Sequence, residues 1–267
     1  MILSTHGIIG SSAASGDADA LAFITAAAIT DTTQKSAINT LVTQLKTYGI
    51  WTKMNALYPM VGGSATSHKF NLKDPRDLDA AYRLTFSGGW THSSTGAKPN
   101  GTTGYANTYF KPSLNATLNS HHLSYYSRTN SSSGGVEIGV ANHPNYDLLQ
   151  LLYAGTINYG LVNQSSLTTN FTDTNSLGLY VAKRTASNNV SIWKNGINKI
   201  SDTASSTSLL NGNVFIGAKN DLGLNVVNDF TTKESAFTSI GDGLTDAEAA
   251  NFYTAVQAYN TTLNRQV

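Results

Sequence analysis

The 267-residue sequence contains no cysteine, which excludes a disulfide framework and any chemistry that needs a thiolate. Charged residues are also scarce: they make up 12% of the chain, against about 25% in average soluble domains. The formal net charge is +1 and no block of basic residues occurs, so we expect no nucleic-acid partner. The polar surface must therefore come mainly from Ser, Thr and Asn.

Long apolar runs are missing as well. No stretch approaches the roughly 18 consecutive apolar residues of a membrane-spanning helix, so we expect no membrane partner. Residues 1–6 lack the basic start and the apolar core of a secretory signal. The simplest expectation is a protein made in the cytoplasm and then released by lysis or assembled into a particle.

Motifs for common enzyme chemistry are absent. The sequence has no P-loop, no GxGxxG and no GxSxG, and its histidines lack the spacing of a zinc site. Glycoside hydrolysis needs two carboxylates on either side of one bond. The only glutamates are Glu137, Glu234 and Glu248; Glu137 has no carboxylate two or four residues away, and Glu248 is explained by a helix cap. We therefore expect no catalytic residue, no cofactor and no enzymatic activity.

The first part of the chain is helical in pattern. Asp17–Ala28 is rich in alanine, and Asp31 with Gln34 resembles a capping box that opens a second helix ending at Gly49. Residues 50–60 are dense in large apolar groups and are expected to form a buried connection. The prediction is a helical segment over residues 17–63, packed on the remainder of the protein.

Residues 1–16 are predicted to form an N-terminal arm. The apolar stretch Gly7–Gly10 is followed by a linker of small residues. We expect residues 2–10 to add a strand to a sheet edge or to dock on a partner subunit, because such a terminus has little other reason to be ordered.

Residues 64–267 are predicted to form one β-sandwich. Apolar and polar residues alternate there with a period of two, the pattern of strands with one buried face. The Asn195-Gly196 pair indicates a tight hairpin, and the Ser/Gly run Asn130–Gly135 is interpreted as a hairpin loop. The alternating segments are 82–86, 136–140, 177–182, 190–193 and 214–217.

A helix over residues 245–264 is predicted to close the chain. Thr245 and Glu248 form a capping box, and an apolar stripe follows at helical spacing.

Several of these segments carry a resemblance to a known fold family. The resemblance rests on the segments VSIWKNG (190–196), VFIGA (214–218), SAF (235–237) and LTDAEAANFY (244–253). With them, the stretch 177–252 resembles laminin-G-like, concanavalin A-like jelly rolls. The resemblance implies a mainly β jelly-roll sandwich with a short C-terminal helix.

The front of the chain resembles proteins of tailed phages. The segments that carry this similarity are THGII (5–9), GIWTKM (49–54), YPMVGG (58–63) and HKFNLKDPRDLD (68–79). The resemblance implies a virion component of the tail, fibre or head surface. Its partners would then be other virion proteins, copies of itself in a homo-oligomer and, for an attachment role, a host-surface glycan.

Aromatic residues are the candidates for ligand binding. Sugar rings stack on aromatic faces, so Trp90, Tyr105, Tyr125 and Tyr126 could form a carbohydrate site, although strand aromatics also alternate into a core. Tyr125 and Tyr126 are consecutive, so at least one is expected to leave the core face, where a glycan or a neighbouring subunit would cover it.

Asp74, Asp77 and Asp79 are the candidates for a metal site. Calcium prefers several oxygen ligands, but a turn at Asp74-Pro75 and a cap at Asp77 explain the same residues. The adjacent His121 and His122 should point to opposite faces of a strand, one half-buried and one facing solvent.

The sequence thus favours a non-catalytic virion structural protein that uses a lectin-like domain for assembly or host attachment. A carbohydrate-binding module or adhesin is the alternative, and a glycan hydrolase is the third reading.

Overall fold

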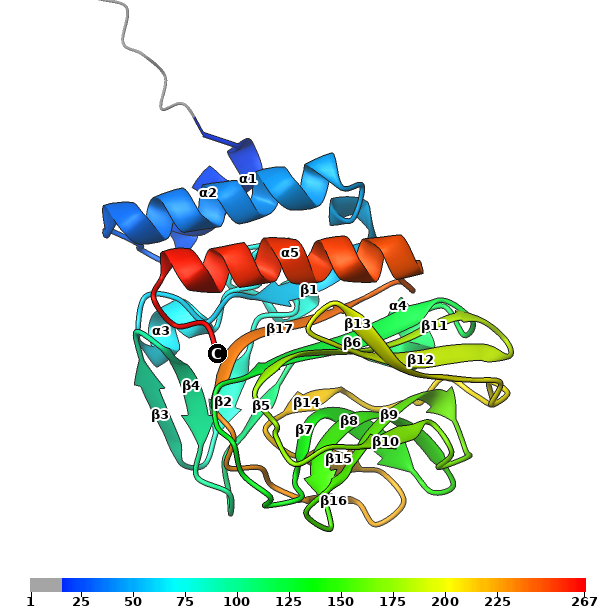
Figure 1. The fold of residues 1–267 in the computed structure, drawn as a ribbon. Helices are drawn as coiled ribbons and strands as arrows, with labels where there is room; N and C mark the ends of the chain where they lie inside the picture. Colours follow the sequence, from blue (N-terminus) through cyan, green and yellow to red (C-terminus); the bar gives the residue numbers. More distant parts are fainter. Residues whose placement is uncertain (1–15) are drawn as a thin grey trace, which may run out of the picture.

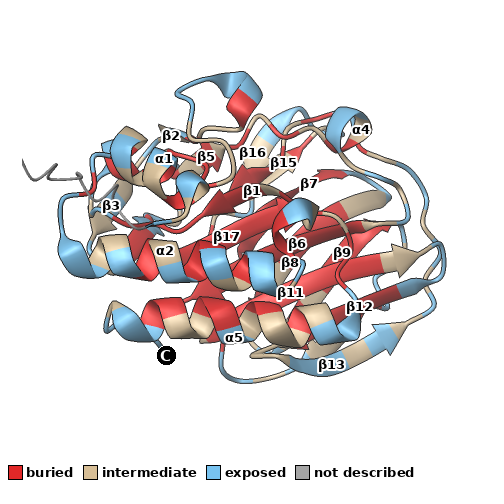
Figure 2. Cartoon of the chain, turned by 90° about the horizontal axis from the view of Figure 1, so that it is seen from above, coloured by how far each residue is buried: buried red, intermediate tan, exposed pale blue. Residues whose placement is uncertain are grey.

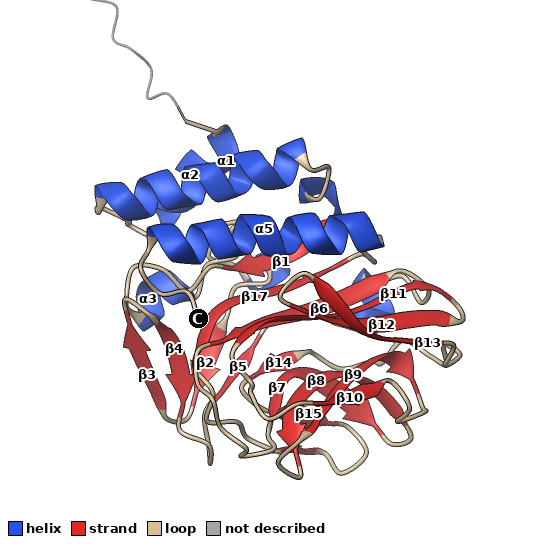
Figure 3. Ribbon diagram, viewed as in Figure 1, coloured by secondary structure: helices blue, strands red, loops and turns tan. Residues whose placement is uncertain are grey.

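The computed structural model describes residues 16–267 (Figure 1). The strand expected at residues 2–10 lies outside this range, as does the arm predicted over residues 1–16 apart from Gly16. Two antiparallel sheets stack face to face, and three helices form a further layer on one of them (Figures 1 and 3). This is the mainly β, jelly-roll-like sandwich that the sequence predicted.

The eight-stranded sheet lies in the middle of the three layers. Its central strand is β6, which pairs with β11 on one side and β17 on the other. In spatial order its strands are β13 (Ile197–Asp202), β12 (Asn189–Lys194), β11 (Gly178–Ala186), β6 (His121–Ser127), β17 (Ser235–Gly241), β4 (Gly96–Pro99) and β3 (Trp90–Ser93), with β1 (Met54–Tyr58) also paired to β17.

The nine-stranded sheet forms the layer farthest from the helices. Its strands in order are β10 (Asn170–Thr172), β9 (Ile157–Gln164), β8 (Asn145–Tyr153), β7 (Val136–Asn142), β14 (Phe215–Ile216), β5 (Tyr105–Asn107) and β2 (Thr85–Ser87), with β15 (Lys219–Asp221) beside β7 and β16 (Val226–Asn228) beside β15.

The helices begin where the sequence carries capping residues. Asp31 accepts a hydrogen bond from the Gln34 amide, and Thr245 and Glu248 form both bonds of a capping box. The large helices are α1 (Ala18–Ala26), α2 (Thr32–Thr47) and α5 (Asp246–Thr262); short ones are α3 (Ala65–His68), α4 (Pro112–Asn115) and the 3-10 turns η1 (Trp51–Lys53) and η2 (Asp79–Ala81). None of the helices in the described part of the chain has the length and apolar character that a membrane span requires.

The expectation for residues 50–60 was wrong in one respect. Instead of an irregular connection, this region contains β1, whose residues Ala56–Tyr58 pair with Thr238–Ile240 of β17. Short apolar runs can form a buried strand as readily as a buried connection, and here the edge of β17 recruits the run into the sheet.

The middle sheet is buried on both faces. Along β11, Leu179 and Val181 pack into a core shared with the helices, whereas Tyr180 and Ala182 pack into the core between the sheets. Every residue of β6 and β17 is buried, and Figure 2 shows α2 and α5 lying over these strands. The prediction of one buried face per strand is therefore wrong for this sheet, because the helices cover what would be its solvent face.

A buried arginine holds the end of α5 to the sandwich. Arg265 donates hydrogen bonds to the carbonyl oxygens of Met60, Pro59 and Ala236 at 2.6–3.0 Å, and to the Asn260 side chain at 2.8 Å. The guanidinium is almost fully buried, and these acceptors replace the water that it loses.

Two local predictions differ from the structure. Asn130–Gly135 does not close a hairpin but carries the chain from β6 in one sheet to β7 in the other. The strand predicted over 82–86 begins only at Thr85, because Tyr82 ends η2 in a left-handed backbone conformation with φ of 58°. The hairpin predicted at Asn195-Gly196 is confirmed, since it joins β12 to β13.

The helical layer should be as important to stability as the sandwich core. Phe252 of α5 is fully buried against His122 and Phe237 of the middle sheet. We expect Phe252→Ala to lower the free energy of unfolding by about 3–5 kcal/mol, because it leaves a cavity between helix and sheet. Denaturant unfolding monitored by circular dichroism measures the change.

Thr254→Ala is the matched control, because Thr254 lies on the exposed side of the same helix and surface substitutions cost within about 0.5 kcal/mol. Equal, small effects of the two substitutions would show that the helices are not an integral layer.

Candidate functional site

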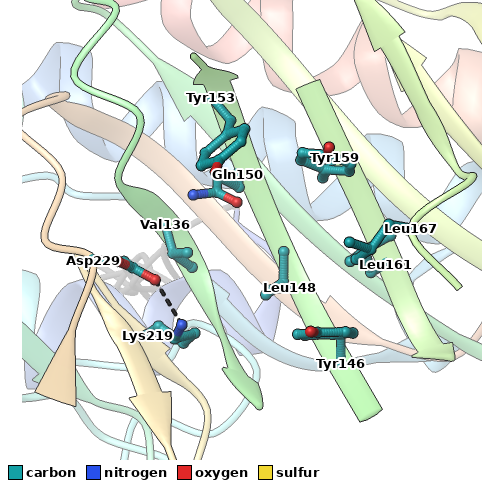
Figure 4. A pocket seen from close by; sticks show the side chains of 10 residues that line it. All are labelled: Val136, Tyr146, Leu148, Gln150, Tyr153, Tyr159, Leu161, Leu167, Lys219 and Asp229. Atoms are coloured by element: carbon teal, nitrogen blue, oxygen red, sulfur yellow. Dashed lines mark ion pairs between the residues drawn. The ribbon is translucent and has the colours of Figure 1, made fainter. Parts of the chain in front are cut away.

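The outer face of the nine-stranded sheet carries a pocket of about 260 Å³ over β7, β8 and β9 (Figure 4). The helical layer lies on the opposite side of the molecule and does not reach it (Figure 1). The residues that line it are Val136, Tyr146, Leu148, Gln150, Tyr153, Tyr159, Leu161, Leu167, Lys219 and Asp229.

The floor of the pocket is apolar. Val136, Leu148 and Leu161 form a small cluster that is separate from the two main cores. Leu148 and Leu161 are direct partners across β8 and β9, and cross-strand neighbours on one face pack against each other.

Three tyrosines surround this floor. Tyr153 and Tyr159 lie with ring centroids 5.8 Å apart and planes tilted by 60°. Tyr146 is held by a 2.9 Å hydrogen bond between its hydroxyl and His143 Nδ1. Tyr153 is 48% exposed, so its ring is available to a ligand.

Two β-bulges place pocket residues on the outer face. Leu149 and Leu151 point into the core, and a strict period of two would send Tyr153 there as well. The register between β8 and β9 shifts between Gln150 and Tyr153, and Leu152 has a φ of 55°, so Tyr153 turns outward. A second shift between Val136 and Ile138 places Val136 outside and Ile138 inside.

Gln150 supplies an oriented amide at the centre of the pocket. Its Nε2 donates to the Gly134 carbonyl oxygen at 2.6 Å. This bond turns Oε1 toward the Tyr159 side of the pocket, as Figure 4 shows. The side chain therefore offers a hydrogen-bond acceptor to a ligand.

A lysine and an aspartate form the side of the pocket opposite the tyrosines. Lys219 Nζ lies 2.6 Å from Asp229 Oδ2 and 3.3 Å from Asp221 Oδ2 (Figure 4). Burial disfavours the charge of Lys219, but the hydrogen bonds and charges of Asp229 and Asp221 outweigh it and raise the lysine pKa. Lys219 is therefore charged at neutral pH, and its charge is neutralised locally.

Of the aromatic residues predicted to bind a ligand, Trp90 and Tyr105 lie outside this pocket. Trp90 Nε1 donates to the carbonyl oxygens of Ser87 and Tyr105, which face each other at the end of the β2–β5 pair, and its partly buried ring packs against the core between the sheets. The Tyr105 ring stacks on Phe215 with centroids 4.8 Å apart.

Tyr125 and Tyr126 are both fully buried, so the prediction that either binds a ligand from solvent was wrong. Tyr125 points between the sheets and donates to the Lys233 carbonyl oxygen at 2.7 Å. Tyr126 does leave that core, as expected, but α5 covers it. Its hydroxyl donates a hydrogen bond to Gln257 Oε1 of this helix at 2.9 Å. The cover is a helix of the same chain and not a glycan or a second subunit.

The three candidate metal ligands are engaged with basic side chains. Asp79 pairs with Arg83 at 2.9 Å, and Asp77 pairs with both Lys69 and Arg83. Asp74 pairs with Arg76, whose hydrogen bonds lower the pKa of the carboxyl group. Among residues 16–267, no three His, Cys, Asp or Glu side chains are arranged to hold a metal ion.

His121 and His122 point to opposite faces of β6, as expected, but both are fully buried, which corrects the expected solvent exposure of one. His121 lies between the Gly241 carbonyl oxygen and the Asp147 carboxylate. His122 donates from Nδ1 to the Asp242 carbonyl oxygen at 2.6 Å, and Nε2 accepts from the Ser239 hydroxyl at 2.9 Å. The second face is covered because the helices lie on it.

All three glutamates have structural partners. Glu137 is fully buried and lies 3.0 Å from Lys233 Nζ, with further hydrogen bonds from the Leu151 amide and the Thr231 hydroxyl. Glu234 pairs with Arg128 at 3.2 Å, and Glu248 completes the cap of α5 and pairs with Lys53.

The candidates named from the sequence thus do not form the pocket. Tyr146 and Tyr159 lie on β8 and β9, in stretches for which the sequence predicted no strand. Tyr153 and Asp229 depend on irregular backbone that their residue types do not signal: a bulge positions the first, and a left-handed backbone with φ of 52° positions the second.

Comparisons with known proteins give the fold. No protein-family model matches the sequence, and no curated protein matches it. Among solved structures, the receptor-binding domain of a botulinum neurotoxin C/D mosaic serotype is similar with a TM-score of 0.50 at 12% identity, over 77% of this chain and 52% of that one. Domain 4 of AbnA, an extracellular GH43 arabinanase from Geobacillus stearothermophilus solved with arabinotriose, has a TM-score of 0.46 at 13% identity, over 75% of this chain and 98% of that one. The chain therefore spans about half of the neurotoxin domain, and the likeness supports a shared sandwich fold.

The buried histidines predict a pH dependence of stability. Burial lowers the pKa of His122 to about 3, despite the hydrogen bond to Asp242, and burial beside His92 lowers that of His68 to about 3. Both folded-state pKa values lie below the usual histidine value of 6.5, so the stability contribution is complete above that pH and is lost as pH falls toward 3.

We expect the free energy of unfolding to fall by about 1.4 kcal/mol per pH unit for each histidine within this window. His122→Gln should reduce the slope between pH 6 and 5 by about that amount, measured by urea unfolding. Thr254→Ala, an exposed substitution that removes no titratable group, should leave the slope unchanged. An unchanged slope in His122→Gln would contradict the role of this histidine.

Proposed function

We propose that this protein is a non-catalytic glycan-binding protein, and that the pocket over β7, β8 and β9 holds the sugar. The observation that carries the proposal is an apolar floor flanked by the Tyr153–Tyr159 pair on one side and the Asp229 carboxylate on another. Small-molecule sites combine an apolar surface with a few oriented polar groups in this way.

The apolar and the hydrogen-bonding surfaces of the pocket match the two kinds of surface on a sugar ring. The C–H face of a pyranose is apolar and stacks on an aromatic ring or an aliphatic floor, which Tyr153, Tyr159 and Leu148 supply. The hydroxyl edge needs hydrogen-bond acceptors, which Gln150 Oε1 and the Asp229 carboxylate supply.

The chemistry of the pocket supports binding without hydrolysis. Glycosidases place two carboxylates about 5–9.5 Å apart across the scissile bond, and Asp229 is the single carboxylate among the residues that line this pocket. Glu137 is buried in an ion pair, and Glu234 and Glu248 pair with Arg128 and Lys53. Asp221, which also pairs with Lys219, is mostly buried and is not among the residues that line the pocket. A single carboxylate facing the ligand supports binding without cleavage.

We further propose that this binding serves attachment of a phage particle to its host. The similarity of residues 5–9, 49–54, 58–63 and 68–79 to tailed-phage proteins supports this setting. Mass spectrometry of purified particles from the source should then find this chain as a virion component, and particles that lack it would contradict the setting.

Truncation of the exposed tyrosine should weaken binding. We expect Tyr153→Ala to lower the affinity for a bound oligosaccharide by at least about threefold, because an aromatic stacking partner contributes about 0.5–1.5 kcal/mol beyond the apolar area that it buries. A panel of immobilised neutral and acidic oligosaccharides first identifies a ligand, and titration calorimetry then measures its dissociation constant.

Tyr105→Ala is the matched control, because Tyr105 lies on the same sheet but outside the pocket. Its affinity should stay within a factor of about two of the unmodified protein. An equal loss of affinity in both variants would show that the pocket is not the binding site. A folded Tyr153→Ala protein with unchanged affinity would show the same.

Catalysis should be undetectable. Incubation with β-glucans, arabinan and alginate should release no reducing ends above background, because a single carboxylate lines the pocket. Hydrolysis that disappears in Asp229→Asn would show that the site is an enzyme active site.

A further inference from the structure

We infer that the pocket selects uncharged sugars over acidic ones, and that Asp229 determines this selectivity. The inference rests on the proposed function and adds the chemical class of its ligand. Two observations support it: the geometry of the Lys219–Asp229 pair, and the hydrogen bonds that the neighbouring polar groups already make.

The pocket offers no free positive charge. Lys219 is the single Lys or Arg among the residues that line it. Its ammonium group lies 2.6 Å from Asp229 and 3.3 Å from Asp221, so two carboxylates share one cation. The sum of these three charges is negative, which disfavours a uronate or sialate beside them.

Asp229 is the member of this pair that a ligand would meet. Its side chain is 44% exposed, whereas that of Lys219 is 16% exposed. The Asp229 carbonyl oxygen accepts a hydrogen bond from the Val136 amide at 2.8 Å, which ties the residue to the pocket floor. Asp229 is therefore the more exposed member of the pair, and its backbone is fixed to the floor of the pocket.

The other polar groups of the pocket do not supply a charged donor for a ligand carboxylate. Recognition of a carboxylate uses charge-assisted donors, above all guanidinium or ammonium groups. One N–H group of the Gln150 amide is bound to the Gly134 carbonyl oxygen and the other is a neutral donor, while the Tyr146 hydroxyl is bound to exposed His143. The hydroxyls of Tyr153 and Tyr159 are neutral donors. The pocket thus presents acceptors to sugar hydroxyls and has little to offer an acidic group.

The test uses pairs of oligosaccharides that differ only in charge. Suitable pairs are cello-oligomers and their C6-oxidised forms, and galacturonan oligomers and their methyl esters. Calorimetry of the full chain should show that the neutral member of the bound pair binds at least about tenfold more tightly, because juxtaposed like charges oppose binding.

Asp229→Asn should shrink this ratio at least about threefold, because it removes a negative charge and leaves Lys219 with one counter-charge. Asn keeps the size and an acceptor oxygen, so affinity for the neutral member should change less than the ratio. Asp77→Asn, at an exposed ion-paired residue outside the pocket, is the control and should leave the ratio unchanged.

The possible outcomes distinguish between the proposed glycan binding, the charge selectivity and the role of Asp229. Tighter binding of the acidic member overturns the selectivity inference while glycan binding stands. A ratio that Asp229→Asn leaves unchanged overturns the role of Asp229. Absence of binding to every pair by the folded protein overturns the proposed function and this inference with it.

Discussion

Burial of the eight-stranded sheet on both faces is the constraint on which the remaining structure depends. All residues of β6 and β17 are buried, half of them against the second sheet and half against α2 and α5. The helices therefore occupy the face that a two-layer sandwich would leave open to a ligand. The broad sheet face that stays open in the described part of the chain is the outer face of the other sheet, where the pocket lies.

The ionisable groups in the interior form ion pairs and hydrogen bonds with one another and with the backbone. Glu137 and Lys233 form a fully buried ion pair, and Arg184 donates to carbonyl oxygens of Val162, Ala186 and Ser187. Such groups are expensive to bury and are tolerated because each finds hydrogen-bond partners. Glu137, Lys233 and Arg184 are thereby held inside the core and are not among the residues that line the outer pocket.

Local sequence signals predicted much of the fold but little of the site. Capping residues such as Asp31 and Thr245 located helix starts, and Asn195-Gly196 located a hairpin, because each acts through its immediate neighbours. The burial of Tyr126 and His122 was missed because it depends on a helix more than 100 residues away. Tyr153 was missed because a bulge reverses the face that alternation predicts.

The binding surface can be located by mapping which backbone amides change on addition of a bound neutral oligosaccharide, by NMR or hydrogen exchange. We expect the changes to centre on β8 and β9 between Tyr146 and Leu161, and to extend to Lys219 and Asp229. Helices α2 and α5 should be unaffected, because they cover the opposite sheet. Changes confined to the helical layer, or to the surroundings of Trp90, would contradict the central claim that the closed middle sheet leaves the outer face as the binding surface.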